Sequence, residues 1–309
     1  MTQKQIAING FEIIINCNEV INLFLHTLNI YGLLGYHGTQ YKLRQHEGVI
    51  NSIDKKIRED VKEGDRYYSY GNLNIYVPSM NYIMDNETWK NPISAENIHM
   101  GNKQMQPAFQ KSWDEFYKDY WHNTNDERAK LFHDCVNAFD FAEAAKKMSF
   151  ATHTEFPKEI YIFPAEASAG SGLKFSDNVC MGDLFVGGDM GFVHEGLHLL
   201  LQENWARNDE IIKFMNVSNY NDKNYGSWAA KYEQILVVGL DCCIRDFEDE
   251  RAKKYYQGCG VSNEFNIAYP LIKSYYQNGC KEPIENVMLK IIKQTKTDLK
   301  GWRYCDYIE

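Results

Sequence analysis

The fold of this 309-residue chain is decided by one stretch, Gly191-Phe-Val-His194-Glu195-Gly-Leu-His198-Leu-Leu-Leu201. In an α-helix, residues four positions apart lie about 40° apart on one face. His194 and His198 would therefore lie one turn above each other, where two imidazoles can share a tetrahedral zinc ion. Glu195 follows the first His, so its carboxylate can reach a water on the metal without binding the metal. The pattern HExxH thus predicts two zinc ligands and a general base.

The flanking sequence favours placing this pattern on a helix. Residues 183–186 are expected to form a strand, which Gly187-Gly188 ends, and Asp189 can cap a helix over about residues 191–204. Three apolar residues are available for the buried sides of that helix: Phe192, Val193 and Leu197. The alternative is a pair of histidines on a partly buried helix that bond only to neighbouring side chains.

A catalytic zinc ion needs a third protein ligand and an open fourth position. Glu203 is five residues beyond His198 on the same helix, so it points about 140° away and is excluded as that ligand. Asp209 and Glu210 lie in a polar connection and are expected to be solvated.

Glu233 is the preferred third ligand because it lies at the margin of a strongly apolar helix over about residues 225–247. A carboxylate in such a position needs a compensating cation or hydrogen-bond partner. A helix packed antiparallel to the HExxH helix could bring Glu233 to the metal. Asp241, two turns further on, is the fallback ligand or a partner that orients one of the histidines.

The sequence HEGLH at 194–198, followed by Glu233 on a separate helix, resembles the gluzincin group of zinc metallopeptidases. The resemblance covers about residues 157–245, including the segments Glu159-Ile-Tyr-Ile-Phe163 and Gly182-Asp-Leu-Phe-Val-Gly187, which are similar to the strands before the active-site helix of that group. It implies a zincin-like fold with His194, His198 and Glu233 as zinc ligands and Glu195 as base and proton shuttle.

The N-terminal half is similar at best to uncharacterised bacterial gluzincin-like proteins. The thermolysin-like pattern NExxxD is absent, since Lys231, Tyr232 and Val237 surround Glu233 instead. The metzincin pattern HExxHxxGxxH is absent too.

Peptide hydrolysis also needs a donor for the charge that develops on the carbonyl oxygen. Tyr269 is the preferred candidate because Pro270 beside it would fix its backbone. A packing role for this Tyr is the alternative. Three further candidates lie in the C-terminal half: Tyr225, Tyr232 and Arg245.

The periodicity along the chain predicts an α+β fold that is predominantly helical, with a small sheet before the HExxH helix. We expect a mostly helical lobe over residues 1–150 and a zincin-like lobe over residues 151–309. Helices are expected at 18–34, 45–62, 107–121, 126–148, 191–204, 225–247, 262–276 and 283–293, and strands at 6–16, 73–77, 159–163 and 183–186.

The strand over residues 159–163 is bounded by Pro157 and Pro164. Since Pro cannot donate to a ladder, this predicts an edge strand. An edge strand could pair with an extended peptide substrate.

The composition excludes several classes of protein. Thirty-three basic and 42 acidic residues give a net charge of −9 with no basic run, which argues against nucleic acid or an anionic membrane surface as partner. The longest apolar stretch, residues 11–36, is interrupted by polar residues, so no membrane span is expected. The absence of a visible signal peptide, together with eight scattered cysteines lacking CxxC spacing, favours a cytoplasmic protein with reduced thiols.

The sequence therefore predicts a zinc-dependent metallopeptidase acting on a peptide or protein substrate. The competing hypothesis is a gluzincin-like scaffold that binds metal or peptide without turnover. Retention of Glu195 favours the enzyme, because a purely structural zinc prefers four protein ligands.

Overall fold

The structure, a computed structural model, describes ten segments of the chain: 3–8, 10–30, 82–85, 87–90, 106–166, 173–176, 179–183, 189–205, 209–211 and 228–297. It divides into two compact units, 1–139 with 159–192, and 140–158 with 193–309. This division differs from the expected boundary at residue 150, because the strand after residue 158 pairs with a strand near the N-terminus. The helix expected at 45–62 and the strand expected at 73–77 lie outside the described residues.

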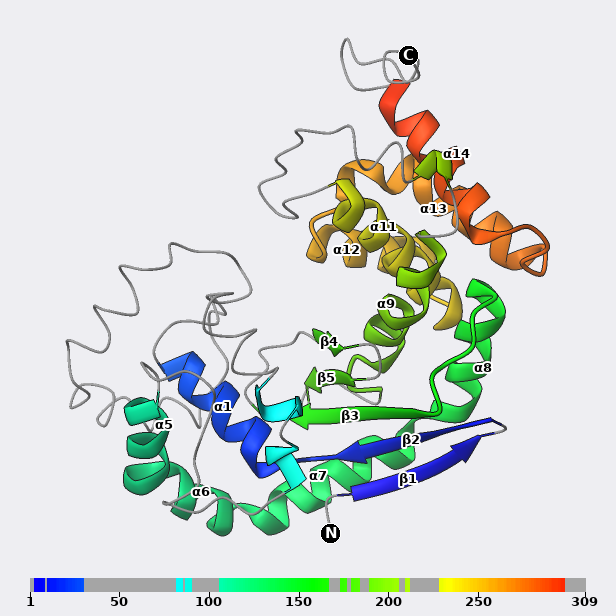
Figure 1. The fold of residues 1–309 in the computed structure, drawn as a ribbon. Coiled ribbons are helices and arrows are strands. Elements are labelled where there is room, and N and C mark those ends of the chain that lie inside the picture. Colours follow the sequence, from blue (N-terminus) through cyan, green and yellow to red (C-terminus); the bar gives the residue numbers. More distant parts are fainter. Residues whose placement is uncertain are drawn as a thin grey trace. The chain divides into compact units, whose positions relative to one another are not determined.

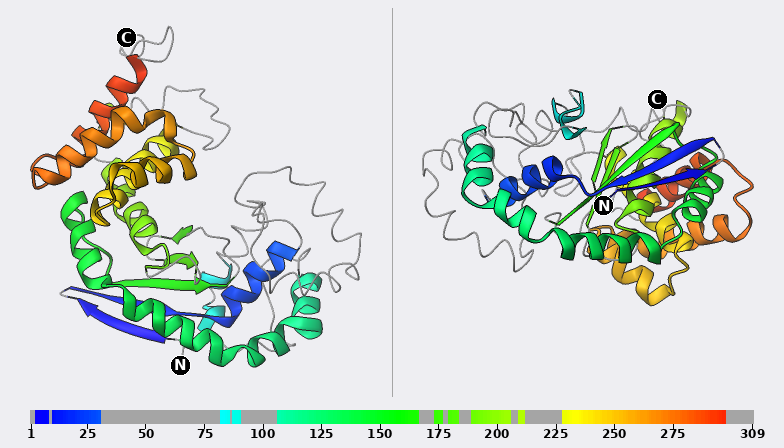
Figure 2. Two further views of the ribbon diagram at one scale, coloured as in Figure 1. Left: turned by 180° about the vertical axis from the view of Figure 1, so that it is seen from behind. Right: turned by 90° about the horizontal axis from the view of Figure 1, so that it is seen from below.

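The first unit contains a five-stranded sheet in the order β1-β2-β3-β5-β4 (Figure 1). Its strands are β1 (Gln3–Ile8), β2 (Phe11–Asn16), β3 (Glu159–Ala165), β4 (Leu173–Ser176) and β5 (Val179–Asp183). β1 and β2 form an antiparallel hairpin (Figures 1 and 2), which turns at Gly10 with a φ of 96° that favours glycine. β3 is parallel to both β2 and β5, and β4 is antiparallel to β5. The α+β class is confirmed.

The prediction that residues 159–163 form an edge strand is wrong. β3 pairs with β2 on one side and with β5 on the other, so it lies in the middle of the sheet. An extended peptide therefore cannot add to β3. Among the described strands, the edges are β1 and β4.

Pro164 is tolerated inside β3 because the hydrogen-bond ladder between β2 and β3 ends before this residue. The pairing of β2 with β3 stops at Ile15 and Ile162. The Pro164 carbonyl accepts a hydrogen bond from Asn22 Nδ2 at 3.2 Å, so it faces the chain beyond the end of β2. Since N–H and C=O of one strand residue point to the same side, the missing donor of Pro164 leaves no gap in a ladder.

The helices of the first unit begin with α1 (Glu19–Ile30), whose cap was predicted. Asn18 Oδ1 accepts hydrogen bonds from the backbone N–H groups of Val20 and Ile21, at 2.9 and 3.2 Å. The helix expected at 107–121 is formed by α5 (Gln106–Ser112), a π-helical segment η3 (Trp113–Tyr117) and α6 (Lys118–Asn123). A short 3₁₀ segment, η2 (Thr88–Lys90), buries Trp89 against the rings of β3.

The helix expected at 126–148 is two helices, α7 (Asn125–Ala138) and α8 (Phe141–Thr152). Phe139 is extended between them, and Asp140 Oδ1 accepts from Glu143 N at 2.9 Å, which starts a new helix. Sequence reasoning missed this break between the two helices. Asp140 is a residue type that can cap a helix, but the apolar residues on both sides of it continue one helical spacing.

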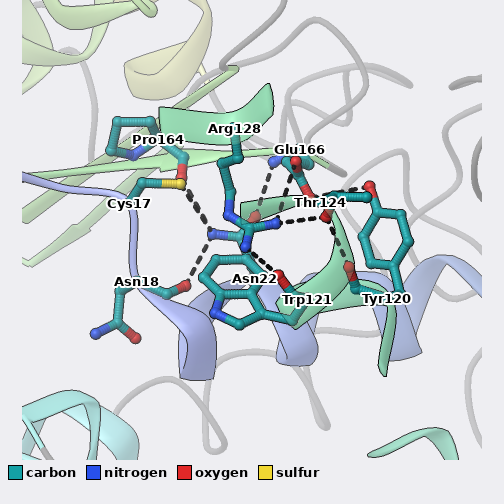
Figure 3. A network of polar contacts seen from close by, with 9 residues as sticks. All are labelled: Cys17, Asn18, Asn22, Tyr120, Trp121, Thr124, Arg128, Pro164 and Glu166. Carbon is teal, nitrogen blue, oxygen red and sulfur yellow. Dashed lines mark hydrogen bonds and ion pairs between the residues drawn. The ribbon is translucent and has the colours of Figure 1, made fainter. Parts of the chain in front are cut away.

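A buried arginine connects α7 to the end of β3 (Figure 3). The side chain of Arg128 is completely buried; it donates to Thr124 Oγ1 at 2.9 Å and to Trp121 O at 2.5 Å. Its guanidinium lies 3.4 Å from the centre of the Trp121 ring and 3.7 Å from Oε1 of Glu166. The other carboxylate oxygen of Glu166 accepts a hydrogen bond from Tyr120 OH at 3.1 Å. These contacts give the terminal nitrogens of the buried guanidinium their partners, whereas Arg128 Nε has no hydrogen-bond partner among the described residues.

The second unit is helical where it is described. After α8 it contains α9 (Phe192–Trp205, whose first residue belongs to the first unit), α11 (Trp228–Ile244), α12 (Asp249–Gly258), η4 (Ser262–Glu264), α13 (Phe265–Gln277) and α14 (Ile284–Thr297). α11 is its centre, since it contacts α8, α12, α13 and α14 (Figure 1) and residues 235–240 are all buried. Sequence reasoning missed α12. No helix in the described part of the chain has the length and apolar character needed to cross a membrane.

The contact between α11 and its neighbours at Gly239 can be tested by Gly239→Ala. A Cβ there would lie 2.3 Å from Ile272 Cδ1 and 2.6 Å from Tyr256 OH, so we expect the free energy of unfolding to fall by about 1–3 kcal/mol. Urea denaturation measures this. Gly258→Ala is the matched control, because a Cβ at this position in α12 meets nothing within 4 Å. Equal stability of the two variants would contradict the packing described.

Candidate functional site

The HExxH segment forms the first two turns of α9, as predicted. Phe192 N donates to Asp189 O at 2.8 Å, so the helix starts where the cap was expected. The rings of His194 and His198 lie on one face with centroids 5.1 Å apart and planes inclined by 68°. The apolar residues expected on the buried sides are completely buried: Phe192, Val193 and Leu197.

α11 runs antiparallel to α9 at this face. His198, the later of the two histidines, contacts Glu233 and Gln234 at the beginning of α11, whereas His194 contacts Gln234 and Asp241 further along it. The sequence analysis expected a second helix in this orientation. The structure therefore brings together both histidines, Glu233 and Asp241.

The Nδ1 atom of each imidazole is held by a carboxylate. His198 Nδ1 lies 2.5 Å from Glu233 Oε1. His194 Nδ1 lies 3.4 Å from Asp241 Oδ2 and 2.9 Å from the hydroxyl of Tyr255, which itself donates to Asp241 Oδ2 at 2.6 Å. A carboxylate on one ring nitrogen fixes the orientation of the ring and is the usual outer partner of a metal-binding histidine.

The Nε2 atoms of the two imidazoles meet at one side chain. The amide of Gln234 places Oε1 3.1 Å from His198 Nε2 and Nε2 3.2 Å from His194 Nε2. With this orientation, Gln234 accepts from His198 Nε2 and donates to His194 Nε2.

The surroundings of the site shift the pKa values of two of its groups, His198 and Asp241. Burial lowers the pKa of His198, but the hydrogen bond to Glu233 and the charges of Glu195 and Glu233 outweigh it, so the pKa lies above its ordinary value. Asp241 is completely buried, which raises its pKa, yet its bonds to His194 and Tyr255 and the charge of Arg245 hold the pKa below its usual value. Asp241 is therefore an anion that lies beside Nδ1 of His194.

Glu195 lies inside the same charged cluster. It is only 5% exposed, and its charge acts on both His198 and the thiol of Cys259. Burial, followed by the charge of Asp241, raises the pKa of Cys259 to about 12, and the thiol also contacts Gln234. The cluster thus has a buried carboxylate beside the two imidazoles, as a general base requires.

The donor chemistry of the cluster fits zinc at two of the three expected ligands. Two imidazoles whose Nε2 atoms converge, each supported at Nδ1, are ready to bind a cation. The third ligand is not in position, because Glu233 contacts Nδ1 of His198. In keeping with this, no three His, Cys, Asp or Glu side chains within the described segments form a group that could hold a metal ion.

Tyr269 lies in a packed aromatic cluster. Its ring contacts Tyr256 and Phe265, and its hydroxyl donates to the carbonyl of Phe247 at 3.3 Å. Of the alternative donors, Tyr232 is buried with its hydroxyl 2.7 Å from Thr295, and Arg245 pairs with Asp241. Tyr225 lies outside the described residues.

Sequence reasoning missed two members of the cluster, Tyr255 and Gln234. Tyr255 comes from α12, which was not predicted, so no signal pointed to it. Gln234 adjoins the expected ligand Glu233 in the chain, and this adjacency was the one available hint. Asp209 and Glu210 are exposed as expected, and the side chain of Glu203 lies outside the described part.

The comparisons with known proteins add no relative. No family model matches the chain, and neither a curated protein nor a solved structure matches it.

The contact between Glu233 and His198 predicts the effect of Glu233→Gln in protein stripped of divalent cations. Without the carboxylate, burial dominates, so the pKa of His198 should fall toward or below its ordinary value of 6.5. A raised folded-state pKa stabilises the protein fully below the unfolded-state value, and this stabilisation is lost as pH rises through the folded-state pKa. Glu233→Gln should not show this pH-dependent loss of stabilisation. NMR titration of the ring nitrogens measures the shift.

Glu250→Gln is the control, because Glu250 is exposed on α12. An unchanged His198 titration in Glu233→Gln would show that the carboxylate does not hold Nδ1.

Proposed function

We propose that this chain is a zinc-dependent metallopeptidase with a zincin-like active site. The observation that carries the proposal is the paired arrangement of His194 and His198. Their Nε2 atoms both contact Gln234, while Glu233 holds Nδ1 of His198 and the Tyr255 hydroxyl, itself bonded to Asp241, holds Nδ1 of His194. Such a pair on one helix, with Glu195 between them in sequence, is the ligand and base arrangement of HExxH peptidases. A packing role alone would not require two separately supported imidazoles to converge.

His194 and His198 would hold the zinc through Nε2, and Glu233 would complete the set after its side chain turns from Nδ1 of His198. The chemistry that zinc supplies when bound is polarisation of the scissile carbonyl and a lower pKa for the attacking water. Glu195 would accept the proton from that water and deliver it to the leaving amine. Asp241 and Tyr255 would keep His194 in the tautomer that presents Nε2.

The substrate class is peptide or protein, as the resemblance to gluzincins implies. The middle position of β3 removes the strand that was expected to pair with an extended substrate. The hydroxyl of Tyr269 donates to the carbonyl of Phe247, so this residue is not proposed as the donor for the developing oxyanion.

The second candidate is a gluzincin-like scaffold without turnover. One observation favours it: Gln234, Glu233, Tyr255 and Asp241 satisfy both imidazoles by hydrogen bonds alone. A polar cluster that satisfies itself can stabilise a fold without a metal. Digestion of a broad peptide mixture by zinc-loaded protein separates the two candidates.

Glu195→Gln tests the enzyme directly. The substitution keeps size and polarity and removes the ability to carry a proton. Peptide hydrolysis should therefore fall by about 10²–10⁴-fold, while zinc content and thermal stability remain close to those of the parent. The measurement is the rate of cleavage of a peptide mixture by equally zinc-loaded proteins. Equal rates in parent and variant would exclude Glu195 as the base.

Zinc stoichiometry in purified variants tests the ligands. His194→Ala and His198→Ala should each lose the bound ion, because the remaining donors cannot hold a catalytic site. Glu233→Ala should lose it too, whereas Asp241→Asn should weaken it by about 10–100-fold, as expected for an outer partner. Elemental analysis after dialysis measures the content.

His153→Ala is the matched histidine control, since His153 lies at the end of α8 and bonds to the carbonyl of Cys280. Full retention of zinc by either His194→Ala or His198→Ala would refute the metal site. Loss in Asp241→Asn with retention in Glu233→Ala would make Asp241 the ligand.

A further inference from the structure

Gln234 occupies the position that a metal ion bound to the two histidines would take. Its amide contacts Nε2 of His198 through Oε1 and Nε2 of His194 through Nε2, at 3.1 and 3.2 Å. These are the only nitrogens that the carboxylates leave to face inward, because Glu233 and Asp241 hold the Nδ1 atoms. One side chain therefore binds both potential metal ligands at once.

The position of Gln234 in α11 explains how it does so. Glu233 and Gln234 are consecutive, so their side chains diverge by about 100° around the helix. One reaches Nδ1 and the other reaches Nε2 of the same His198 ring, which is held from two sides. A neutral amide can match both rings because it donates to one and accepts from the other.

We propose that Gln234 is an internal competitor for the metal: its amide closes the site in the cation-free chain and must turn away when a divalent cation binds to His194 and His198. The inference rests on the proposed function, since it needs the histidine pair to bind a cation. It goes further by assigning a gating role to a residue that is neither a ligand nor the base. Metal loading is then slower and weaker than the donor set alone would allow.

The size of the effect follows from the two hydrogen bonds that metal binding must break. Each is worth about 1 kcal/mol net, and two together correspond to about a 30-fold change in an equilibrium constant. Removing the amide should therefore raise the affinity for the cation by about 10- to 30-fold. It should also raise the association rate, because no internal bond has to open first.

The test uses the full chain, stripped with a chelator and titrated with Zn²⁺ against a chromophoric competitor. The variants are Gln234→Ala and Gln234→Leu, the second of which retains bulk if the first fails to fold. Gln257→Ala is the control, since Gln257 is exposed on α12. Circular dichroism verifies folding, and the NMR signals of the imidazole nitrogens in cation-free protein report the loss of the amide contacts.

We expect both Gln234 variants to bind Zn²⁺ about 10- to 30-fold more tightly and faster than the parent, with Gln257→Ala unchanged. Equal affinity, or weaker affinity as if Gln234 were itself a ligand, would overturn the inference. If the parent binds Zn²⁺ through His194 while the Gln234 variants match it, the inference fails and the proposed function stands. If neither the parent nor any variant binds Zn²⁺ in a His194-dependent manner, both fail.

Discussion

The second unit depends on the hydrogen bonds by which α11 holds the two imidazoles of α9. Asp241 is completely buried and the side chains of His194 and His198 are 15% and 17% exposed, so this cluster is costly unless its polar atoms are satisfied. Glu233 and Asp241, one on each ring, satisfy the Nδ1 atoms, and Gln234 joins the Nε2 atoms. This one constraint fixes the antiparallel alignment of the two helices. Leu197 of α9 and Leu236 of α11 are both buried in this unit.

The same arrangement connects stability to chemistry. An imidazole oriented at Nδ1 has a defined lone pair or proton at Nε2, so it is prepared for a ligand before the ligand arrives. Here Gln234 takes that place, and the cluster is closed without a cation. The side chains that satisfy the imidazoles of this cluster are thus the ones proposed to hold, orient or compete for the cation.

The parts of this structure that the sequence predicted are those set by local spacing. The cap at Asn18 and the alignment of His194 with His198 depend on residues within one or two turns. Features set by distant residues were not accessible. The strand containing Pro164 is central because β2, about 145 residues earlier, pairs beside it, and the division into two units follows the same pairing. Likewise, the sequence predicted that Glu233 would lie close to the histidines. It did not predict which imidazole nitrogen Glu233 contacts or that Tyr255 of α12 joins the cluster, because both depend on three-dimensional packing.

The central claim is that His194 and His198 form one cation site through their Nε2 atoms. X-ray absorption spectroscopy at the zinc edge of the loaded protein tests it most directly. The account predicts a shell of nitrogen and oxygen donors at about 2.0–2.1 Å, including two imidazoles, with no sulfur. Zinc surrounded by oxygen alone, or bound to sulfur at about 2.3 Å, would contradict it, the latter by making Cys259 or another thiol the ligand.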